Sequence, residues 1–345
     1  MTISVVDPPV SEYLFFLYGT SVRYATSSSL LAEPVVELLR YFRRDALDDS
    51  VPLSLSFQAV RNRADIPLRL SPSARHLYSS PAEAPGDHPN ADLTHEIIKD
   101  EGRLIMDFCN LGVLVIDNTK SQCDGYIIQP QTLPEDVIEF LFHRALIELL
   151  RYRDLYMVHA TALENNGFGI LIPGSSGRGK TTSFISLLRS GYRYLSDDYP
   201  LFRNVGDHVE LLPFPMRTSV TENTIAFFPE LRNAPDHILR PGIYKRSFYA
   251  EELYSTSVGE CCRPALMLFP KVVDAPRSRL ERIPKSRAME ILLPQALLVY
   301  DPEVARREFQ VLAKLAQQVD CYRLHFGRDI LDLPELITPL LEQVH

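Results

Sequence analysis

The stretch that decides the fold is Gly174-Ser175-Ser176-Gly177-Arg178-Gly179-Lys180-Thr181-Thr182. It fits the pattern G-x-x-x-x-G-K-[ST], in which glycines let backbone N–H groups converge on phosphate oxygens without interference from Cβ atoms. Lys180 would neutralise the outer phosphates, and Thr181 would offer its hydroxyl to Mg²⁺. The alternative is a plain Gly/Ser turn between a strand and a helix, but such a turn does not require Gly-Lys-Thr. We therefore predict that all nine residues bind a nucleotide.

The sequence on both sides of this loop predicts an α/β domain. Two β-type runs, Leu155–Leu163 and Phe168–Ile172, flank the dipeptide Asn166-Gly167, which is typical of a hairpin turn. A helix is expected over Lys180–Arg189, where its N-terminus would favour a bound phosphate. Gly191 would end this helix. Further strands are expected at Tyr192–Ser196, Leu201–Asn204, Val209–Leu212, Pro264–Pro270 and Cys321–Phe326, and further helices at Arg287–Leu293, Pro302–Gln317 and Leu333–Gln343.

The first part of the chain is strand-rich and predicts a separate α+β domain. We expect this domain over residues 1–130, with a role in acceptor binding, and a catalytic domain over residues 131–345. The Ser/Pro/Ala/Gly-rich segment Ser71–Asp92 is expected to be an exposed loop. Thr132-Leu133-Pro134-Glu135 is a capping-box pattern that predicts a helix running to about Arg151. Strands are expected at Tyr13–Tyr18, Leu53–Val60, Glu96–Lys99, Leu104–Phe108, Val113–Ile116 and Tyr126–Ile128, and a helix at Leu31–Phe42.

Composition excludes several classes of protein. The 345 residues are 46% hydrophobic and 23% charged, which is ordinary for a globular protein. A net charge of −8 argues against nucleic acid or an anionic membrane as a partner. The sequence contains no stretch of 18 apolar residues, so we expect no transmembrane helix. The N-terminus does not resemble a signal peptide. The five cysteines show no C-x-x-C spacing, so we expect reduced thiols in a cytoplasmic protein.

A pair of carboxylates, Asp197-Asp198, ends the strand expected after the phosphate-loop helix. This strand should lie beside the loop in the sheet, and at a strand end both side chains can turn toward the site. One carboxylate can hold Mg²⁺ and the other can accept a hydroxyl proton from a phosphoryl acceptor. The alternative is a turn pair before Tyr199-Pro200, since Asp is common there. Because the pair follows a phosphate-loop lysine so closely, we favour the functional interpretation.

His159 lies in the run before the hairpin. A lone histidine in a strand is usually a packing residue, and that interpretation is the simpler one here. The hairpin could nevertheless bring His159 to the mouth of the phosphate loop, where a neutral imidazole could bond to Asp197 and tune it.

Two basic groups follow later in the chain. Arg217 comes after the proline-rich turn Pro213–Pro215, and Lys245-Arg246 comes after Pro241-Gly242. Phosphoryl transfer needs positive charge on the equatorial oxygens, so we include Arg217 and Lys245 among the nucleotide-binding residues. A solvated surface charge is an equal alternative for both, and the favoured interpretation for Arg246.

Residues 156–200 resemble the C-terminal catalytic domain of HPr kinase/phosphorylase. That family shows a histidine-bearing strand, a hairpin, a G-x-S-G-x-G-K-[ST] loop, a helix and a strand ending in Asp-Asp, matched here by His159, Gly174–Thr181 and Asp197-Asp198. The chain is more similar to HPr-kinase-related proteins of bacterial peptide-biosynthesis clusters, including those that phosphorylate lasso peptides. The stretches that look like this group's later landmarks are Pro213–Pro215, the region of Lys245, and Tyr322–Gly327.

The resemblance implies a P-loop kinase domain of the type shared by HPr kinase and ATP-dependent phosphoenolpyruvate carboxykinase. It implies ATP- and Mg²⁺-dependent phosphorylation of a Ser or Thr hydroxyl, and a homo-oligomer. By position, Asp197 would be the general base and Asp198 and Thr181 the Mg²⁺ ligands, while Lys180 would bind phosphates and His159 would line the site. The I-R-G-[LM]-G segment that carries a second metal-side glutamate in HPr kinases is missing, and Glu210 and Glu222 are merely nearby.

The leading functional hypothesis is thus a kinase that uses ATP and acts on a hydroxyl of a peptide or small protein. A kinase for a sugar or metabolite stays open as an alternative, and would need a narrow enclosed pocket. A nucleotide-hydrolysing regulatory switch also stays open, although no residue is an obvious candidate to orient the attacking water.

Overall fold

The chain is a mixed α/β protein that divides into two compact units. The computed structural model describes residues 10–47, 51–80, 93–174, 177–240, 243–296 and 298–343. Its described residues up to Arg153 form the first unit, and those from Asp154 onward form the second. We expected the boundary at residue 130, but the helix α2 (Glu135–Arg151) belongs to the first unit. It does so because its apolar face packs against the strands of that unit's sheet.

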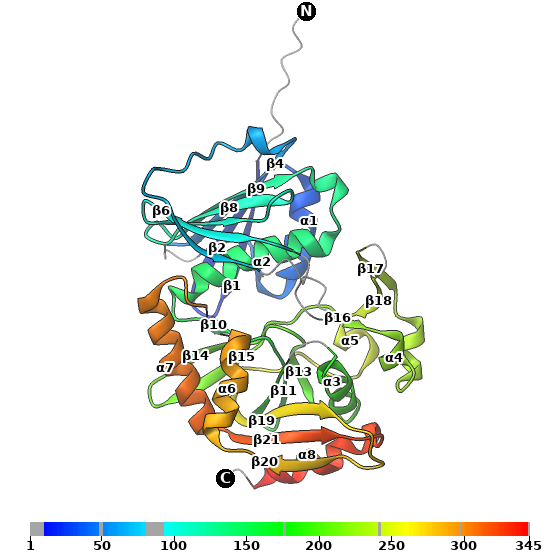
Figure 1. The fold of residues 1–345 in the computed structure, drawn as a ribbon. Coiled ribbons are helices and arrows are strands. Elements are labelled where there is room, and N and C mark those ends of the chain that lie inside the picture. Colours follow the sequence, from blue (N-terminus) through cyan, green and yellow to red (C-terminus); the bar gives the residue numbers. More distant parts are fainter. Residues whose placement is uncertain are drawn as a thin grey trace, which may run out of the picture. The chain divides into compact units, whose positions relative to one another are not determined.

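The first unit is a nine-stranded mixed sheet with two helices on it (Figure 1). The helices α1 (Ser29–Leu38) and α2 pack against each other and against strands β2, β4, β8 and β9. Parallel pairing joins β2 to β4 and β4 to β9, whereas the other neighbours are antiparallel. In sheet order the strands are β3 (Arg43–Arg44), β1 (Ser11–Leu17), β2 (Thr20–Thr26), β4 (Leu53–Val60), β9 (Gln122–Ile128), β8 (Gly112–Asp117), β7 (Arg103–Asp107), β6 (Glu96–Asp100) and β5 (Arg75–Ser79).

Two predictions for the first unit were wrong in detail. The segment Ser71–Asp92 was expected to be a loop, but Arg75–Ser79 pairs with β6 as an edge strand, and residues 81–92 lie outside the described residues. The capping box at Thr132 does not form. Thr132 ends a 3-10 turn, where its hydroxyl donates to the Gln129 carbonyl, and Pro134 is the residue before α2.

The second unit is built on a six-stranded mixed sheet that carries the phosphate loop. Its order is β13 (Arg193–Ser196), β11 (Ala160–Asn165), β12 (Phe168–Pro173), β19 (Arg263–Val272), β21 (Asp320–Phe326) and β20 (Arg279–Arg282). The predicted hairpin is confirmed as β11 and β12, which turn at Asn166-Gly167. The predicted helix is confirmed as α3 (Lys180–Arg189), and Gly191 follows it with a left-handed φ of 87°.

Each face of this sheet has its own apolar core. On one face, α3 and α8 (Leu333–Glu342) cover side chains such as Ile170, Ile172 and Leu324. On the other face, α6 (Lys285–Ala296) and α7 (Pro302–Gln318) cover Leu171, Met267 and Phe269. Figure 1 shows α6 and α7 on the opposite side of the sheet from α8. Helices therefore cover both faces of the sheet.

Two small sheets complete the second unit. One joins β10 (Tyr156–Met157), β14 (Leu201–Val205) and β15 (His208–Leu212), and the other joins β16 (Thr218–Val220), β18 (Ile243–Phe248) and β17 (Asp236–Arg240). The short helix α4 (Glu222–Ile225) lies between β16 and β17 in sequence, and the short helix α5 (Ala250–Leu253) follows β18. None of the helices in the described ranges is both long enough and apolar enough to cross a membrane.

Candidate active site

The topology of the six-stranded sheet gathers three motifs at one edge. Strand β11 is antiparallel to both of its neighbours, β12 and β13. The carboxyl ends of β12 and β13 therefore meet at the same edge of the sheet, and the start of β11 lies between them. The phosphate loop follows β12, Asp197-Asp198 follows β13, and His159 precedes β11. This one edge is the candidate active site.

The phosphate loop adopts backbone conformations that favour glycine. Gly174, Gly177 and Gly179 have φ values of 155°, 75° and 98°, in the region that side chains with a Cβ rarely adopt. A Cβ built on Gly179 would lie 3.0 Å from Cδ1 of Phe326, so the strand end beneath the loop also requires glycine there. Arg178 is exposed on the loop, and Ser175 and Ser176 lie outside the described residues.

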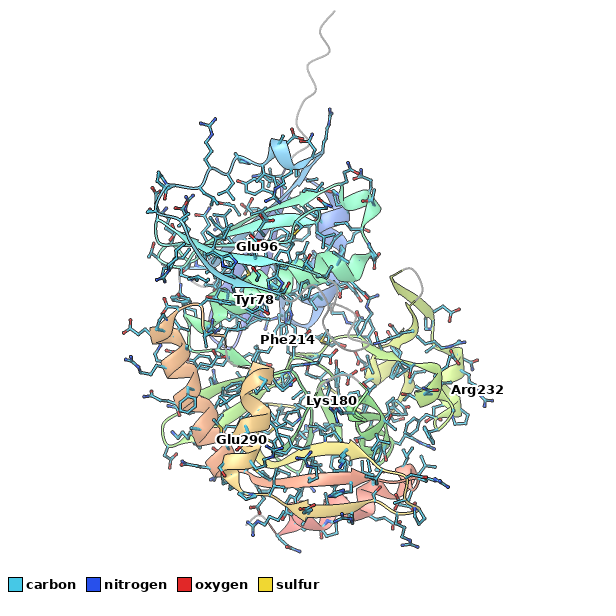
Figure 2. All side chains as sticks on the ribbon, in the orientation of Figure 1. Tyr78, Glu96, Lys180, Phe214, Arg232 and Glu290 are labelled. Carbon is cyan, nitrogen blue, oxygen red and sulfur yellow. The ribbon has the colours of Figure 1, made fainter. Side chains whose placement is uncertain are left out.

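Lys180 is the cation at the centre of this edge. Lys180, labelled in Figure 2, is only 6% exposed. Its Nζ donates to the Gly174 carbonyl at 2.6 Å. Burial lowers the pKa of Lys180, and the charge of Lys245 adds to this, whereas Asp198 and Asp197 oppose it. The lysine is therefore held against the loop, with its charge offset by the two carboxylates.

Asp197 is a buried carboxylate whose negative charge is only partly compensated by the cations and the hydroxyl around it. It is 4% exposed, and its Oδ1 accepts a hydrogen bond from the Thr161 hydroxyl at 3.1 Å. Burial, with the negative charge of Asp198 adding to it, raises the pKa of Asp197 to about 7, although Lys180, the Thr161 hydroxyl and Lys245 act in the opposite direction. A carboxyl group with such a pKa can take up and release a proton near neutral pH.

Asp198 and His159 form the outer part of the site. The Asp198 side chain is 45% exposed, and its Oδ1 lies 3.4 Å from Nε2 of His159. The same Nε2 lies 3.0 Å from Nζ of Lys180. An ammonium group can only donate, so in this contact Nε2 of His159 accepts from Lys180. Nε2 of His159 thus lies close to both the phosphate-loop lysine and the exposed carboxylate.

The prediction that His159 lies within a strand was wrong, whereas its contact with Lys180 agrees with the alternative that it lies at the mouth of the phosphate loop. The run Leu155–Leu163 is split, because β10 pairs with β14 in another sheet before β11 begins. His159 lies at the switch between the two sheets, where its N–H donates to the Gln295 carbonyl at 2.8 Å. The Thr161 hydroxyl, two residues further on, bonds to the Asp197 carboxylate.

The two later basic groups have different surroundings. Lys245 lies on β18, and its charge acts on both Lys180 and Asp197. Arg246 points to the opposite face of the strand, where it contacts Glu222 and the Arg232 carbonyl, in agreement with the favoured surface interpretation. Arg217 is half-buried at the start of β16, a strand that lies against α3.

Two residues that support the site were missed by the sequence analysis. The Thr161 hydroxyl lies within hydrogen-bonding range of both the carbonyl and the carboxylate of Asp197, and so fixes the strand end. The Tyr194 hydroxyl bonds to the N–H and the carbonyl of Met216, and so holds the segment before Arg217 against β13. A threonine in the otherwise apolar run Ala160–Leu163 was a signal that could have identified the first of these. Glu210 and Glu222 pair instead with Arg203 and Arg246.

The residues at this edge fit a nucleotide with Mg²⁺. The glycine backbone and the start of α3 suit phosphate oxygens, and Lys180 supplies the cation. The described residues hold no group of three or more His, Cys, Asp or Glu side chains that could form a protein-only metal cage. Mg²⁺ usually takes only one or two protein ligands, with phosphate oxygens and water as the rest. The Thr181 hydroxyl and the Asp198 carboxylate are oxygen donors of that kind.

Comparison with known proteins found a similarity among solved structures. No family model matches the chain, and no curated protein matches it. Among solved structures, the HPr(Ser) kinase/phosphatase from Coxiella burnetii is similar to part of the chain, with 15% sequence identity. The match covers 54% of this chain and 93% of that chain, with a TM-score of 0.26, which is a low similarity.

Proposed function

We propose that this protein is an ATP- and Mg²⁺-dependent kinase that transfers the γ-phosphoryl group to a Ser or Thr hydroxyl of a peptide or small protein. The single observation that carries the proposal is the position of Asp197. This carboxyl group is buried at the same sheet edge as the phosphate loop, and its pKa is raised to about 7. A carboxylate of this kind suits deprotonation of a hydroxyl next to a bound triphosphate.

In the proposed reaction, Asp197 accepts the proton of the acceptor hydroxyl as that oxygen attacks the γ-phosphorus. The bond from this phosphorus to the β,γ-bridging oxygen breaks, and ADP leaves. Thr161 holds the carboxylate through its hydroxyl, so that the proton-accepting oxygen is kept at one place. Lys180 and Lys245 supply positive charge for the phosphate oxygens, and this charge is worth most where water is excluded. A bound Mg²⁺, held by Thr181 and Asp198, would neutralise charge on the phosphates.

His159 sets the starting position of Lys180 in this proposal. Its Nε2 accepts a hydrogen bond from Nζ, and Oδ1 of Asp198 lies 3.4 Å from the same nitrogen. Lys180 exchanges the His159 and Gly174 contacts for phosphate oxygens when the nucleotide enters. The imidazole then turns to Asp198 and keeps that carboxylate in place.

A transfer assay tests the proposal. The protein is incubated with γ-labelled ATP, Mg²⁺ and a panel of Ser- and Thr-containing peptides, and mass spectrometry locates the phosphoryl group. The expected product is a phosphoserine or phosphothreonine, and Asp197→Asn is expected to lose transfer by a factor on the order of 10³ while it still binds ATP. The control is Asp207→Asn, in the fully exposed turn of the β14–β15 hairpin, which is expected to keep transfer.

Other outcomes would overturn this proposal. Near-wild-type transfer by Asp197→Asn would remove the base assignment. ATP hydrolysis that outpaces transfer to every acceptor would favour a regulatory switch. Phosphorylation of sugars or other metabolites in place of peptides would favour a small-molecule kinase.

A further inference from the structure

A group of basic side chains lies at the same sheet edge as the phosphate loop, outside the site described above. Lys271 on β19 is directly opposite His325 on β21, and His325 is directly opposite Arg279 on β20. Residues in register on neighbouring strands point to the same face, so the three form a cross-strand row. Arg323, two residues before His325, points to this face as well. We call Lys271, Arg279, Arg323 and His325 the basic patch.

The basic patch begins where the apolar core beneath α6 and α7 ends. Phe269, the inward neighbour of Lys271 on this face, belongs to that core. Lys271 and Arg279 are exposed, whereas Arg323 and His325 are half-buried. The face therefore changes within one residue pair from a covered hydrophobic core to exposed cations.

The patch is next to the phosphate loop. Val272 and Phe326 directly follow Lys271 and His325 along their strands. A Cβ built on Gly179 of the loop would lie 3.0 Å from Phe326 and 3.6 Å from Val272. The row that contacts the loop and the row of cations are successive along the strands, about 3.3 Å apart, and point to opposite faces at the same edge of the sheet.

One carboxylate organises the patch without neutralising it. Glu281 accepts from Nε2 of His325 at 2.7 Å, and Arg279 lies 4.0 Å from the same carboxylate. His325, Arg279 and Arg323 together lower the pKa of Glu281, so it stays ionised and holds the imidazole. Three permanent cations and one carboxylate leave a net charge of +2 with His325 neutral, in a chain whose total charge is −8.

We infer that the basic patch docks an acidic stretch of the phosphoryl acceptor. The row spans three strands, so Lys271 and Arg279 are about 10 Å apart at two strand spacings. That span exceeds a single carboxylate and matches acidic side chains spaced along an extended peptide. The charge complementarity would draw the acceptor toward the edge where the phosphate loop lies and raise its local concentration. The inference rests on the proposed function because it assigns the acidic stretch to the acceptor.

A binding experiment tests the inference without phosphoryl transfer. The probes are a fluorescein-labelled peptide with six glutamates around one serine, and the same peptide with glutamines, measured by fluorescence anisotropy. The wild-type protein is expected to bind the acidic peptide more tightly, with an affinity that falls as salt is added. The double variant Lys271→Gln/Arg279→Gln is expected to lose about tenfold in affinity or more, equivalent to about 1.4 kcal/mol.

A matched control is available on the same strand. Arg282 on β20 is 69% exposed, similar to 65% for Arg279, but lies three residues away and so points to the other face. Arg282→Gln is expected to bind the acidic peptide within about twofold of wild type, because a single distant charge is largely screened. In the transfer assay, the double variant is expected to raise KM for acidic acceptors and leave kcat unchanged.

Several results would overturn the inference. These are equal binding of the acidic and glutamine peptides, retained affinity in the double variant, or tighter binding of a single-stranded oligonucleotide of equal charge. A tenfold loss of ATP affinity in the double variant would assign the patch to the nucleotide. Asp197→Asn is expected to bind the acidic peptide like wild type, so a failure of the proposed function would show in the transfer assay and leave this measurement readable.

Discussion

The β11–β13 strand pair has a buried carboxylate near each end, and the two carboxylates have different hydrogen-bond partners. At one end, Glu164 is opposite Arg193, and the arginine Nε and the Gly167 N–H both donate to its carboxylate. At the other end, Asp197 accepts from the Thr161 hydroxyl, and burial raises its pKa to about 7. The two carboxylates are both buried and lie only a few residues apart on neighbouring strands.

In the proposed function, this contrast separates a structural carboxylate, Glu164, from a reactive one, Asp197. The Glu164 carboxylate accepts from the Arg193 cation and from the Gly167 N–H, so it stabilises the hairpin turn at Gly167. Asp197 is near a cation, Lys180, that is itself bonded to the Gly174 carbonyl and to His159. A buried charge that is not fully compensated costs stability, and such a cost is typical of functional sites. Burial alone does not identify the reactive residue; the donors around it do.

The largest expected effect comes from removing the cation at the reactive end. Lys180→Met should weaken ATP binding by more than tenfold and lower transfer by about 10³-fold, since the amine acts on phosphates in a site with little water. Isothermal titration calorimetry with ATP and the transfer assay measure the two effects. Lys314→Met, at a half-buried lysine that bonds to Asn204 and the Gly206 carbonyl, is the control and should change neither. Wild-type ATP affinity in Lys180→Met would show that this lysine does not contact the nucleotide.

The next largest expected effect is an increase in the free energy of unfolding when Asp197 is replaced by asparagine. The folded pKa of Asp197 is about 7 and the unfolded value is near 3.9. The stability linked to this group is therefore fully present below pH 4 and is lost as the pH rises through 7. Asp197→Asn should raise the free energy of unfolding of the ligand-free protein at pH 8 by about 1–3 kcal/mol, and by clearly less at pH 5, where the carboxyl is still protonated in the folded protein. Urea unfolding at both pH values checks this, and a variant less stable than wild type at pH 8 would refute it.

The smallest effect is a loss of stability at the structural end. Glu164→Gln leaves Arg193 without its carboxylate and should lower the free energy of unfolding by about 1–2 kcal/mol, because the arginine is partly exposed and keeps some water. Glu260→Gln is the matched control. Glu260 also approaches Arg193, at 3.9 Å, but is exposed, so its loss should cost less than about 0.5 kcal/mol. Equal losses in the two variants would mean that burial does not strengthen the Glu164 pair.

The local signals around the phosphate loop predicted its fold well. The Asn-Gly turn, the glycines of the loop and Gly191 each favour one backbone conformation, so β11, β12 and α3 could be placed from a few residues. The Asp pair at the end of β13 followed from the same local pattern.

Contacts between distant segments could not be predicted in this way. Both halves of the run Leu155–Leu163 have β-type composition, and only the pairing of β10 with β14 shows that the chain changes sheets at His159. The edge strand β5 is polar and exposed, so its composition resembles a loop, and only its backbone pairing with β6 identifies it. The Thr161 contact to Asp197 joins residues 36 apart, which the order of residues alone does not show.

The most direct test of the central claim compares both ends of the strand pair in one assay. Asp197→Asn and Glu164→Gln are assayed side by side for ATP binding and for transfer per mole of folded protein, with the acceptor identified by mass spectrometry. We expect Asp197→Asn to bind ATP and lose transfer by a factor on the order of 10³, and Glu164→Gln to keep both within about twofold. Equal loss of transfer in the two variants, or retained transfer in Asp197→Asn, would contradict the claim that Asp197 is the reactive carboxylate.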